Sequence, residues 1–145
     1  MAENSERANI GTIFKLNNAL IKQKNRKMAQ WELTSIQADV LAYILDNADK
    51  MEINQLDIQA VFKLTNPTVS GIVDRLEEKD FIKRVKSLKD ARFRRLIPMP
   101  KGMELHDMLI TDSRDAEEQL LRNMDDGEKT EFERLLKLAL DTVEE

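Results

Sequence analysis

The chain has 145 residues and a net charge of −4, with no cysteine and a single histidine. This length suits one compact domain and leaves no room for a second, catalytic domain. The lack of cysteine excludes disulfides, thiolate catalysis and thiol redox sensing, and one histidine seldom makes a metal site. Because the chain opens without a secretion signal and has no stretch apolar enough to span a membrane, we expect a soluble, cytoplasmic protein with no membrane partner.

The charges are distributed unevenly along the chain. Residues 83–101 carry eight bases against the single acid Asp90, whereas residues 103–145 carry fourteen acids against five bases. A charge run is usually a solvated surface, so its context has to decide its meaning. Here the basic surface is concentrated where a polyanion could bind.

Periodic apolar residues predict three helices in the first half of the chain. The first is expected over about Asn9 to Lys27, and the second begins at Thr34 or Ser35, either of which can cap it. A third, short helix is expected over 54–63. Its expected core contacts are Leu56 or Ile58, Val61 and Phe62.

A fourth helix follows after only three residues, Leu64 to Asn66. Proline suits the first helical position and pushes the residue before it out of helical conformation, so Asn66 is the expected cap, with Thr65 the alternative. One face forms an apolar stripe of Val69, Ile72, Val73 and Leu76. The opposite face shows Pro67, Ser70, Gly71 and Asp74.

A β-hairpin and two long helices complete the chain. The hairpin strands are expected at 81–86 and 92–99, separated by the turn sequence SLKDA and closed by Pro98 and Pro100. The helices are expected over about 103–124 and from Asp126 or Gly127 to Val143. The predicted fold class is mainly α with a small β-hairpin wing.

Two short helices with a tight connection, followed at once by a basic hairpin, indicate a winged helix-turn-helix. In such modules the second helix enters the major groove of DNA, so its exposed residues must be small or polar enough to approach base edges. Gly71 fits such a close approach, although a tolerated surface glycine explains it equally well. The candidate DNA-binding residues of this helix are Thr65, Asn66, Pro67, Thr68, Ser70, Gly71 and Arg75.

Three stretches resemble the MarR family of winged-helix transcriptional regulators. They are TSIQADVLAYI, DIQAVFKLTNPTVSGIVDRLEEKDFIKRV and KDARFRRLIPMPKG, and the resemblance covers Leu33 to Gly102. It is strongest in PTVSGIVDRLEEKDFIKR and in the pair Asp90 and Arg92 of the hairpin. The sequence departs from the family pattern where glycine is common, at Lys63 and Asp80, and where many members carry a larger residue, at Gly71.

The resemblance implies a homodimer that binds a pseudo-palindromic operator in double-stranded DNA, most often as a repressor. Within a single domain of 1–145, residues 33–100 would form the DNA-binding lobe, and residues 1–30 and 103–145 a helical dimerisation region. The residues agree, because the first helix and the last two carry apolar stripes without evident partners in the chain. A monomeric helical bundle is the alternative.

The resemblance also assigns roles within the wing. Arg92 would enter the minor groove and Asp90 would orient it, although a plain surface ion pair is the alternative. Strand alternation turns Arg94 and Arg95 to opposite sides, so one of them is expected to pair with an acid inside the lobe. The candidate phosphate contacts are Lys86, Lys89, Arg94 and Arg95.

Two other functions compete with DNA binding. An enzyme is not expected, because the only histidine, His106, lies within a predicted helix and no phosphate-binding glycine loop is present. A winged helix that binds a protein partner would fit the acidic total charge. Many family members also respond to a small aromatic or phenolic ligand, for which Phe14, Trp31 and Tyr43 are candidate contacts, with core packing the alternative. No cofactor is expected.

Overall fold

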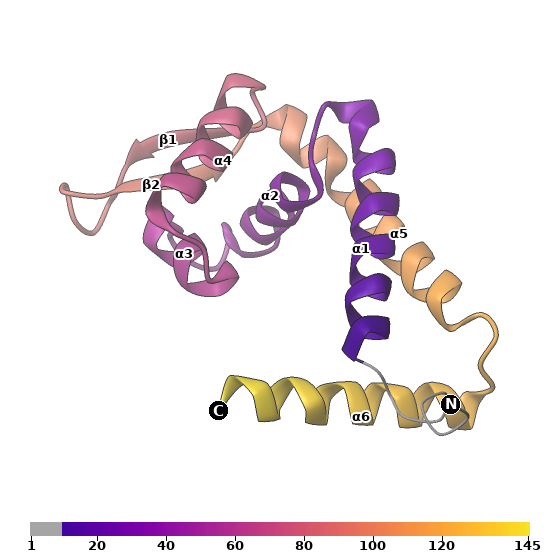
Figure 1. The fold of residues 1–145 in the computed structure, drawn as a ribbon. Coiled ribbons are helices and arrows are strands. Elements are labelled where there is room, and N and C mark those ends of the chain that lie inside the picture. Colours follow the sequence, from indigo (N-terminus) through magenta and orange to yellow (C-terminus); the bar gives the residue numbers. More distant parts are fainter. Residues whose placement is uncertain (1–9) are drawn as a thin grey trace. The chain divides into compact units, whose positions relative to one another are not determined.

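The structure is a computed structural model that describes residues 10–145 (Figure 1). The chain forms two compact units, of which the first ends at Leu109 and the second begins at Ile110. The first unit contains α1 (Ile10–Met28), the 3-10 helix η2 (Ala29–Trp31), α2 (Ser35–Asn47), α3 (Gln55–Phe62), α4 (Asn66–Glu78), β1 (Ile82–Lys86), β2 (Arg94–Pro98) and the start of α5 (Pro100–Leu121). The remainder of α5 and α6 (Asp126–Glu144) belong to the second unit.

Side-chain caps fix the starts of three helices. The side chains of Thr34, Asn54 and Asp125 each accept a hydrogen bond from the backbone N–H three residues later. The side chain at that later position in turn accepts a hydrogen bond from the backbone N–H of the cap residue. These reciprocal bonds satisfy backbone N–H groups that the first turn of a helix leaves unpaired. The prediction that α2 begins at Thr34 or Ser35 is therefore confirmed, with Thr34 as the cap. The predicted start of the first helix, Asn9, lies outside the described residues.

The expected cap of α4, Asn66, was wrong, and the alternative, Thr65, was correct. Thr65, with extended backbone, is the cap, and Asn66 is the first residue of the helix. The side chain of Asn66 does not turn back onto its own helix, because its Oδ1 accepts a hydrogen bond from Nε2 of Gln59 at 3.0 Å. The link to α3 replaces the capping bond.

Helices α3 and α4 end in the same way. Lys63 and Asp80 have φ angles of 53° and 62°, in the left-handed region that favours glycine. The residue after each one donates a backbone hydrogen bond into the last turn of the helix, from Leu64 to the carbonyl of Gln59 and from Phe81 to that of Leu76. This C-terminal bond stops both helices without a glycine.

The wing is a two-stranded antiparallel sheet, with Ile82 opposite Pro98 and Lys86 opposite Arg94. Its strands are shorter than predicted, because residues 87–93 form the tip. Pro100 was expected to close the second strand, but it is instead the first residue of α5. Proline suits this place because its missing N–H would lack a partner in the first turn of a helix.

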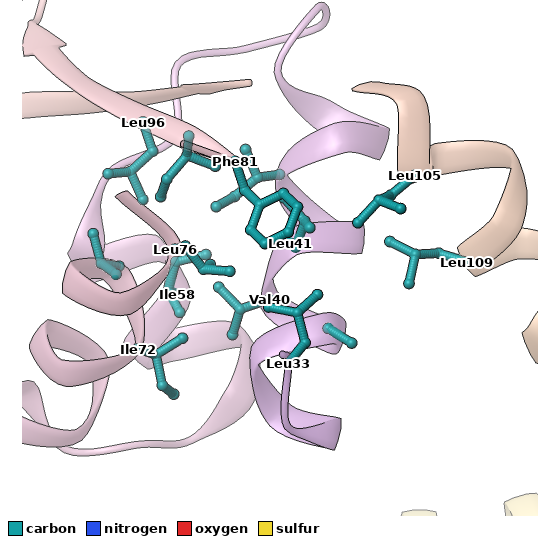
Figure 2. Packing of buried hydrophobic residues seen from close by; sticks show 14 of the residues in the cluster. Leu33, Val40, Leu41, Ile58, Ile72, Leu76, Phe81, Leu96, Leu105 and Leu109 are labelled. Carbon is teal, nitrogen blue, oxygen red and sulfur yellow. The ribbon is translucent and has the colours of Figure 1, made fainter. Parts of the chain in front are cut away.

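The hydrophobic core lies between α2, α3, α4, the wing and the first turns of α5 (Figure 2). The predicted stripe of α4 is confirmed, since Val69, Ile72, Val73 and Leu76 are all buried. In α3 only Ile58 is fully buried, and Phe62 packs against the core. Of the alternatives Leu56 and Ile58, Ile58 is the core contact and Leu56 is exposed; Val61 is also exposed, so its expected core contact was wrong. Helix α3 has only eight residues, and the side that packs against the core is too narrow to bury Leu56 and Val61 as well.

Apolar side chains remain exposed on α1 and α6. Ile10, Ile13 and Phe14 of α1 are each more than half exposed, and α6 has no buried residue although it carries Leu135, Leu136, Leu138, Leu140 and Val143. A soluble monomer rarely leaves such helix faces uncovered. Within residues 10–145, no helix combines the length and the hydropathy needed to cross a membrane.

Candidate nucleic-acid interface

The predicted DNA-reading residues lie on the side of α4 that faces away from the core. Ser70 is half-buried, and the other six, Thr65, Asn66, Pro67, Thr68, Gly71 and Arg75, are exposed. The space around Gly71 is open, because a Cβ built there would meet no atom within 4 Å. The described part of the protein therefore does not itself require a glycine at this position.

Two glutamines of α3 form hydrogen bonds with side chains of α4. Gln55 donates from Nε2 to Oγ of Ser70 at 3.1 Å, and Gln59 donates to Asn66 at 3.0 Å. The glutamines are four residues apart on α3 and their partners are four apart on α4, so one face of each helix makes both bonds. These contacts were not predicted from the sequence, although the matched spacing of four residues could have suggested them.

Asp90 and Arg92 form a bidentate ion pair at the tip of the wing. Nη2 of Arg92 lies 2.7 Å from Oδ2 of Asp90, and Nε lies 3.0 Å from Oδ1, which also accepts the backbone N–H of Arg92. The hydrogen bonds from the guanidinium and then from the backbone lower the pKa of Asp90, and the side-chain bond to Asp90 raises the pKa of Arg92. The Arg92 side chain is 84% exposed, so Asp90 orients a cation that faces solvent.

Basic residues continue along the wing from this pair. Lys86, Lys89 and Arg94 are exposed, and Arg94 lies directly opposite Lys86 in the register. Arg95 is instead half-buried, and its charge contributes to lowering the pKa of Glu52. As strand alternation predicted, only one of the two neighbouring arginines faces outward.

Glu52 connects the wing to the loop before α3. Its carboxylate accepts hydrogen bonds from Oγ of Ser87 at 2.6 Å and from the backbone N–H of Leu88 at 2.8 Å. These two bonds, followed by the charges of Arg95 and Lys89, lower the pKa of Glu52. No local pattern predicts this tether, because it joins residues more than thirty positions apart.

Arg84 was counted with the basic surface, but it lies inside the lobe. Its side chain is 15% exposed and donates to Asp74 at 2.6 Å, Glu77 at 3.0 Å and Gln55 at 3.2 Å. It therefore joins β1 to α3 and α4. Because its donors are used internally, Arg84 does not add to the cationic surface of the wing.

The three candidate ligand contacts have different surroundings. Tyr43 packs edge-on against Phe62, with ring centroids 5.9 Å apart, and Trp31 packs against the core, whereas Phe14 is 60% exposed. A groove of about 620 Å³ lies between α1 and α2. It is lined by Asn17, Ile21, Asn25, Leu33, Thr34, Ser35, Ile36 and Asp39.

Metal-ligating residues do not cluster in residues 10–145, where no group of three or more His, Cys, Asp or Glu side chains could hold an ion. His106 instead lies beside a single carboxylate, with Nε2 2.6 Å from Oδ1 of Asp46. This contact links α5 to α2.

A tight helix pair with an exposed polar second helix and a basic, tethered hairpin define a winged helix-turn-helix protein. Residues 33–93 match the model of the MarR family. A relative from Bacillus subtilis (strain 168), the uncharacterized HTH-type transcriptional regulator YsmB, is 29% identical over 122 residues, which cover 83% of this chain and 82% of the relative. Over this domain the chain is therefore similar to the MarR family of transcriptional regulators.

Solved structures share the fold. MepR of S. aureus in complex with DNA has a TM-score of 0.84 at 22% identity, with 94% of this chain and 99% of that chain covered. A MarR protein from Peptoclostridium difficile DA00132 has a TM-score of 0.84 at 21% identity, with 93% and 86% covered. The transcriptional regulator SlyA has a TM-score of 0.82 at 21% identity, with 92% of both chains covered. These similarities show a winged-helix fold for this chain.

Proposed function

We propose that the protein is a repressor that binds a pseudo-palindromic operator as a homodimer, with α4 in the major groove and the wing in the minor groove. The observation that carries the proposal is the exposed Arg92 held by Asp90 at the wing tip. A guanidinium presented in this way suits the negative potential of a narrow minor groove. Lys86, Lys89 and Arg94 lie near it on the wing and would bind phosphates.

The structure around α4 supports major-groove entry. Its apolar stripe is buried against the lobe, so the polar residues from Thr65 to Arg75 are left for DNA. A hollow of about 400 Å³ lies between the wing and the start of α3. Arg92 and Arg94 line it from the wing, and Asn54 and Gln55 line it from the start of α3. Basic side chains of the wing therefore border the helix-turn-helix, where a DNA backbone would pass.

Uncovered helix faces support a homodimer. The apolar residues of α1 and α6 would be buried by a second copy, with residues 1–30 and 103–145 as the dimerisation region and 33–100 as the DNA-binding lobe of one regulator domain. A two-fold dimer presents two lobes to two half-sites, which explains why such operators are pseudo-palindromic.

A small aromatic or phenolic ligand would act by changing the spacing of the two lobes, which releases the operator. The groove between α1 and α2 supports this part of the proposal. One of its sides is α1, which has an uncovered apolar face, and the other is α2 of the DNA-binding lobe. Phe14 lies on the same face of α1 as Asn17 and Ile21, which line the groove. Trp31 and Tyr43 would respond through the core against which they pack.

The test is binding of the protein to the DNA upstream of its own gene and to a scrambled duplex, at low and high salt. We expect saturable binding that prefers the upstream DNA, weakens with salt and is lost in Arg92→Ala. Arg134→Ala is a matched control, because Arg134 also forms an exposed ion pair, with Glu131 on α6. Weak binding that ignores both sequence and Arg92 would contradict the proposal and favour a protein-binding module.

A further inference from the structure

We propose that Gln55 fixes Ser70 as a hydrogen-bond donor toward DNA, so that Ser70 selects a base edge that offers an acceptor. This inference rests on the proposed function and adds the chemical preference of one position in each half-site. It depends on a chain of three side chains, from Arg84 through Gln55 to Ser70.

The first link is Arg84, which can only donate hydrogen bonds. Its Nη2 and Nη1 are held by Asp74 at 2.6 Å and Glu77 at 3.0 Å, while its Nε points to Gln55 at 3.2 Å. Two carboxylates therefore hold the guanidinium in place. Because a guanidinium offers no acceptor, the end of the Gln55 amide that faces it must be the oxygen.

The second link follows from the shape of an amide. With its oxygen on Arg84, Gln55 turns its NH₂ group toward Ser70, whose Oγ accepts the bond at 3.1 Å. A serine hydroxyl has one hydrogen, which it must then direct elsewhere. Among the described residues, Thr130 and Thr142 on α6 donate to the carbonyl four residues earlier, but Ser70 makes no such bond. Its hydrogen is free for a partner outside the chain.

A donating hydroxyl distinguishes base edges in the major groove. Guanine presents N7 and O6, adenine N7 and thymine O4 as acceptors, whereas cytosine presents only its amino donor there. At the base that Ser70 contacts, the protein is expected to accept any of the first three and to reject cytosine. Gln55, which touches no DNA in this account, thus acts as a positioning residue for Ser70.

Gln55→Glu reverses the hydrogen-bond direction with little change of shape. The carboxylate still accepts from Arg84, but its second oxygen carries no hydrogen, so Ser70 has to donate to it and turn a lone pair outward. The probe is a pool of short duplexes randomised over the operator, selected with the full-length protein. We expect one position in each half-site to change from rejecting cytosine to favouring it, by roughly tenfold.

Gln59→Glu is the matched control, because it adds the same charge one turn further along α3. It is expected to weaken binding to all duplexes and to change base preference only where Asn66, the partner of Gln59, contacts DNA, while the preference at the position that Ser70 contacts stays as in the wild type. Ser70→Ala, which removes a partly exposed hydroxyl, is expected to flatten the preference at the same position that Gln55→Glu reverses. Thermal unfolding of each variant shows that it is folded.

The outcomes separate the inference from the function on which it rests. A uniform loss of affinity in Gln55→Glu, with the wild-type base profile, would overturn the role of Gln55. An unchanged profile in Ser70→Ala would overturn the role of Ser70. A wild-type protein that enriches no sequence from the pool would instead overturn the proposed DNA-binding function itself.

Discussion

Lys86 and Arg94 lie directly opposite each other across the two strands of the wing, and both side chains are exposed. Like charges in this position destabilise a hairpin by repulsion, and a bound polyanion removes the repulsion. The wing therefore keeps a pairing that is unfavourable in the free protein, which agrees with the proposed binding of DNA by the wing.

Lys86→Met is expected to stabilise the free protein slightly, by about 0.2–1 kcal/mol, and to weaken DNA binding. The loss of one phosphate contact should reduce the slope of log K against log salt by about 0.9. Thermal unfolding and fluorescence anisotropy over a salt series measure the two effects. Lys137→Met, which removes the same charge from α6, should leave the slope unchanged; an unchanged slope in Lys86→Met would show that this lysine contacts no phosphate.

Gly71 of α4 and Gly102 of α5 are expected to respond in opposite directions to substitution by alanine. A Cβ on Gly102 would lie 2.3 Å from the backbone oxygen of Phe81, which cannot move aside, so Gly102→Ala should cost roughly 1–3 kcal/mol of unfolding free energy. Gly71→Ala meets open space and should gain roughly 0.5–1 kcal/mol, because alanine favours the helix. Chemical denaturation measures both.

DNA binding by Gly71→Ala decides between the two interpretations of that glycine. A loss of operator affinity in this more stable variant means that DNA approaches the backbone of α4 at Gly71. Unchanged affinity means that Gly71 is a tolerated surface glycine.

The tether of the wing to Glu52 is expected to fail in acid. Hydrogen bonds from Ser87 and Leu88 lower the pKa of Glu52 from its ordinary value of 4.5, so the stabilisation is complete above pH 4.5 and is lost as the pH falls through the lower, folded value. The amide resonance of Leu88 followed by NMR should move with a midpoint below 4.5. Glu52→Gln should abolish this pH-dependent shift of the Leu88 resonance, while the separate titration of Asp90 persists. A midpoint at or above pH 4.5 would show that the tether is absent in solution.

The apolar face of α1 is expected to hold the dimer together. Burying one phenylalanine contributes about 1.5–3 kcal/mol, and a two-fold interface contains Phe14 twice, so Phe14→Glu should shift the protein toward monomer in sedimentation velocity. Operator affinity should fall with it, because a monomer contacts only one half-site. Leu88→Glu makes a similar change at an exposed apolar residue of the wing and should leave the dimer intact. A dimeric Phe14→Glu protein would remove this face from the interface.

Local patterns predicted most of the fold. The stripe of α4 and the cap at Thr34 depend on neighbours within a few residues, and these predictions were correct. The cap of α4 was misplaced because Asn66 is bound by Gln59 of another helix, a contact that no local pattern reveals. Lys63 and Asp80, which stand where glycine is common in the family, adopt left-handed backbone.

The sequence predicted which residue types form the candidate site, but not the hydrogen bonds and ion pairs between them. Basic residues in a hairpin pointed to the wing, but charge alone could not distinguish Arg84, which lies inside the lobe, from the exposed Arg94. The tether of Glu52 and the chain from Arg84 to Ser70 join elements that are distant in sequence. They depend on how the helices and the wing pack, so only the folded structure shows them.

Hydroxyl-radical footprinting of the operator tests the central claim most directly, because it maps groove contacts at single nucleotides. The wild-type protein should protect two segments about 10 base pairs apart, for the two recognition helices, with flanking minor-groove protection from the wings. Arg92→Ala should lose the flanking protection first, while Arg134→Ala keeps the complete pattern. A footprint without minor-groove flanks, or flanks that persist in Arg92→Ala, would contradict the role of the wing.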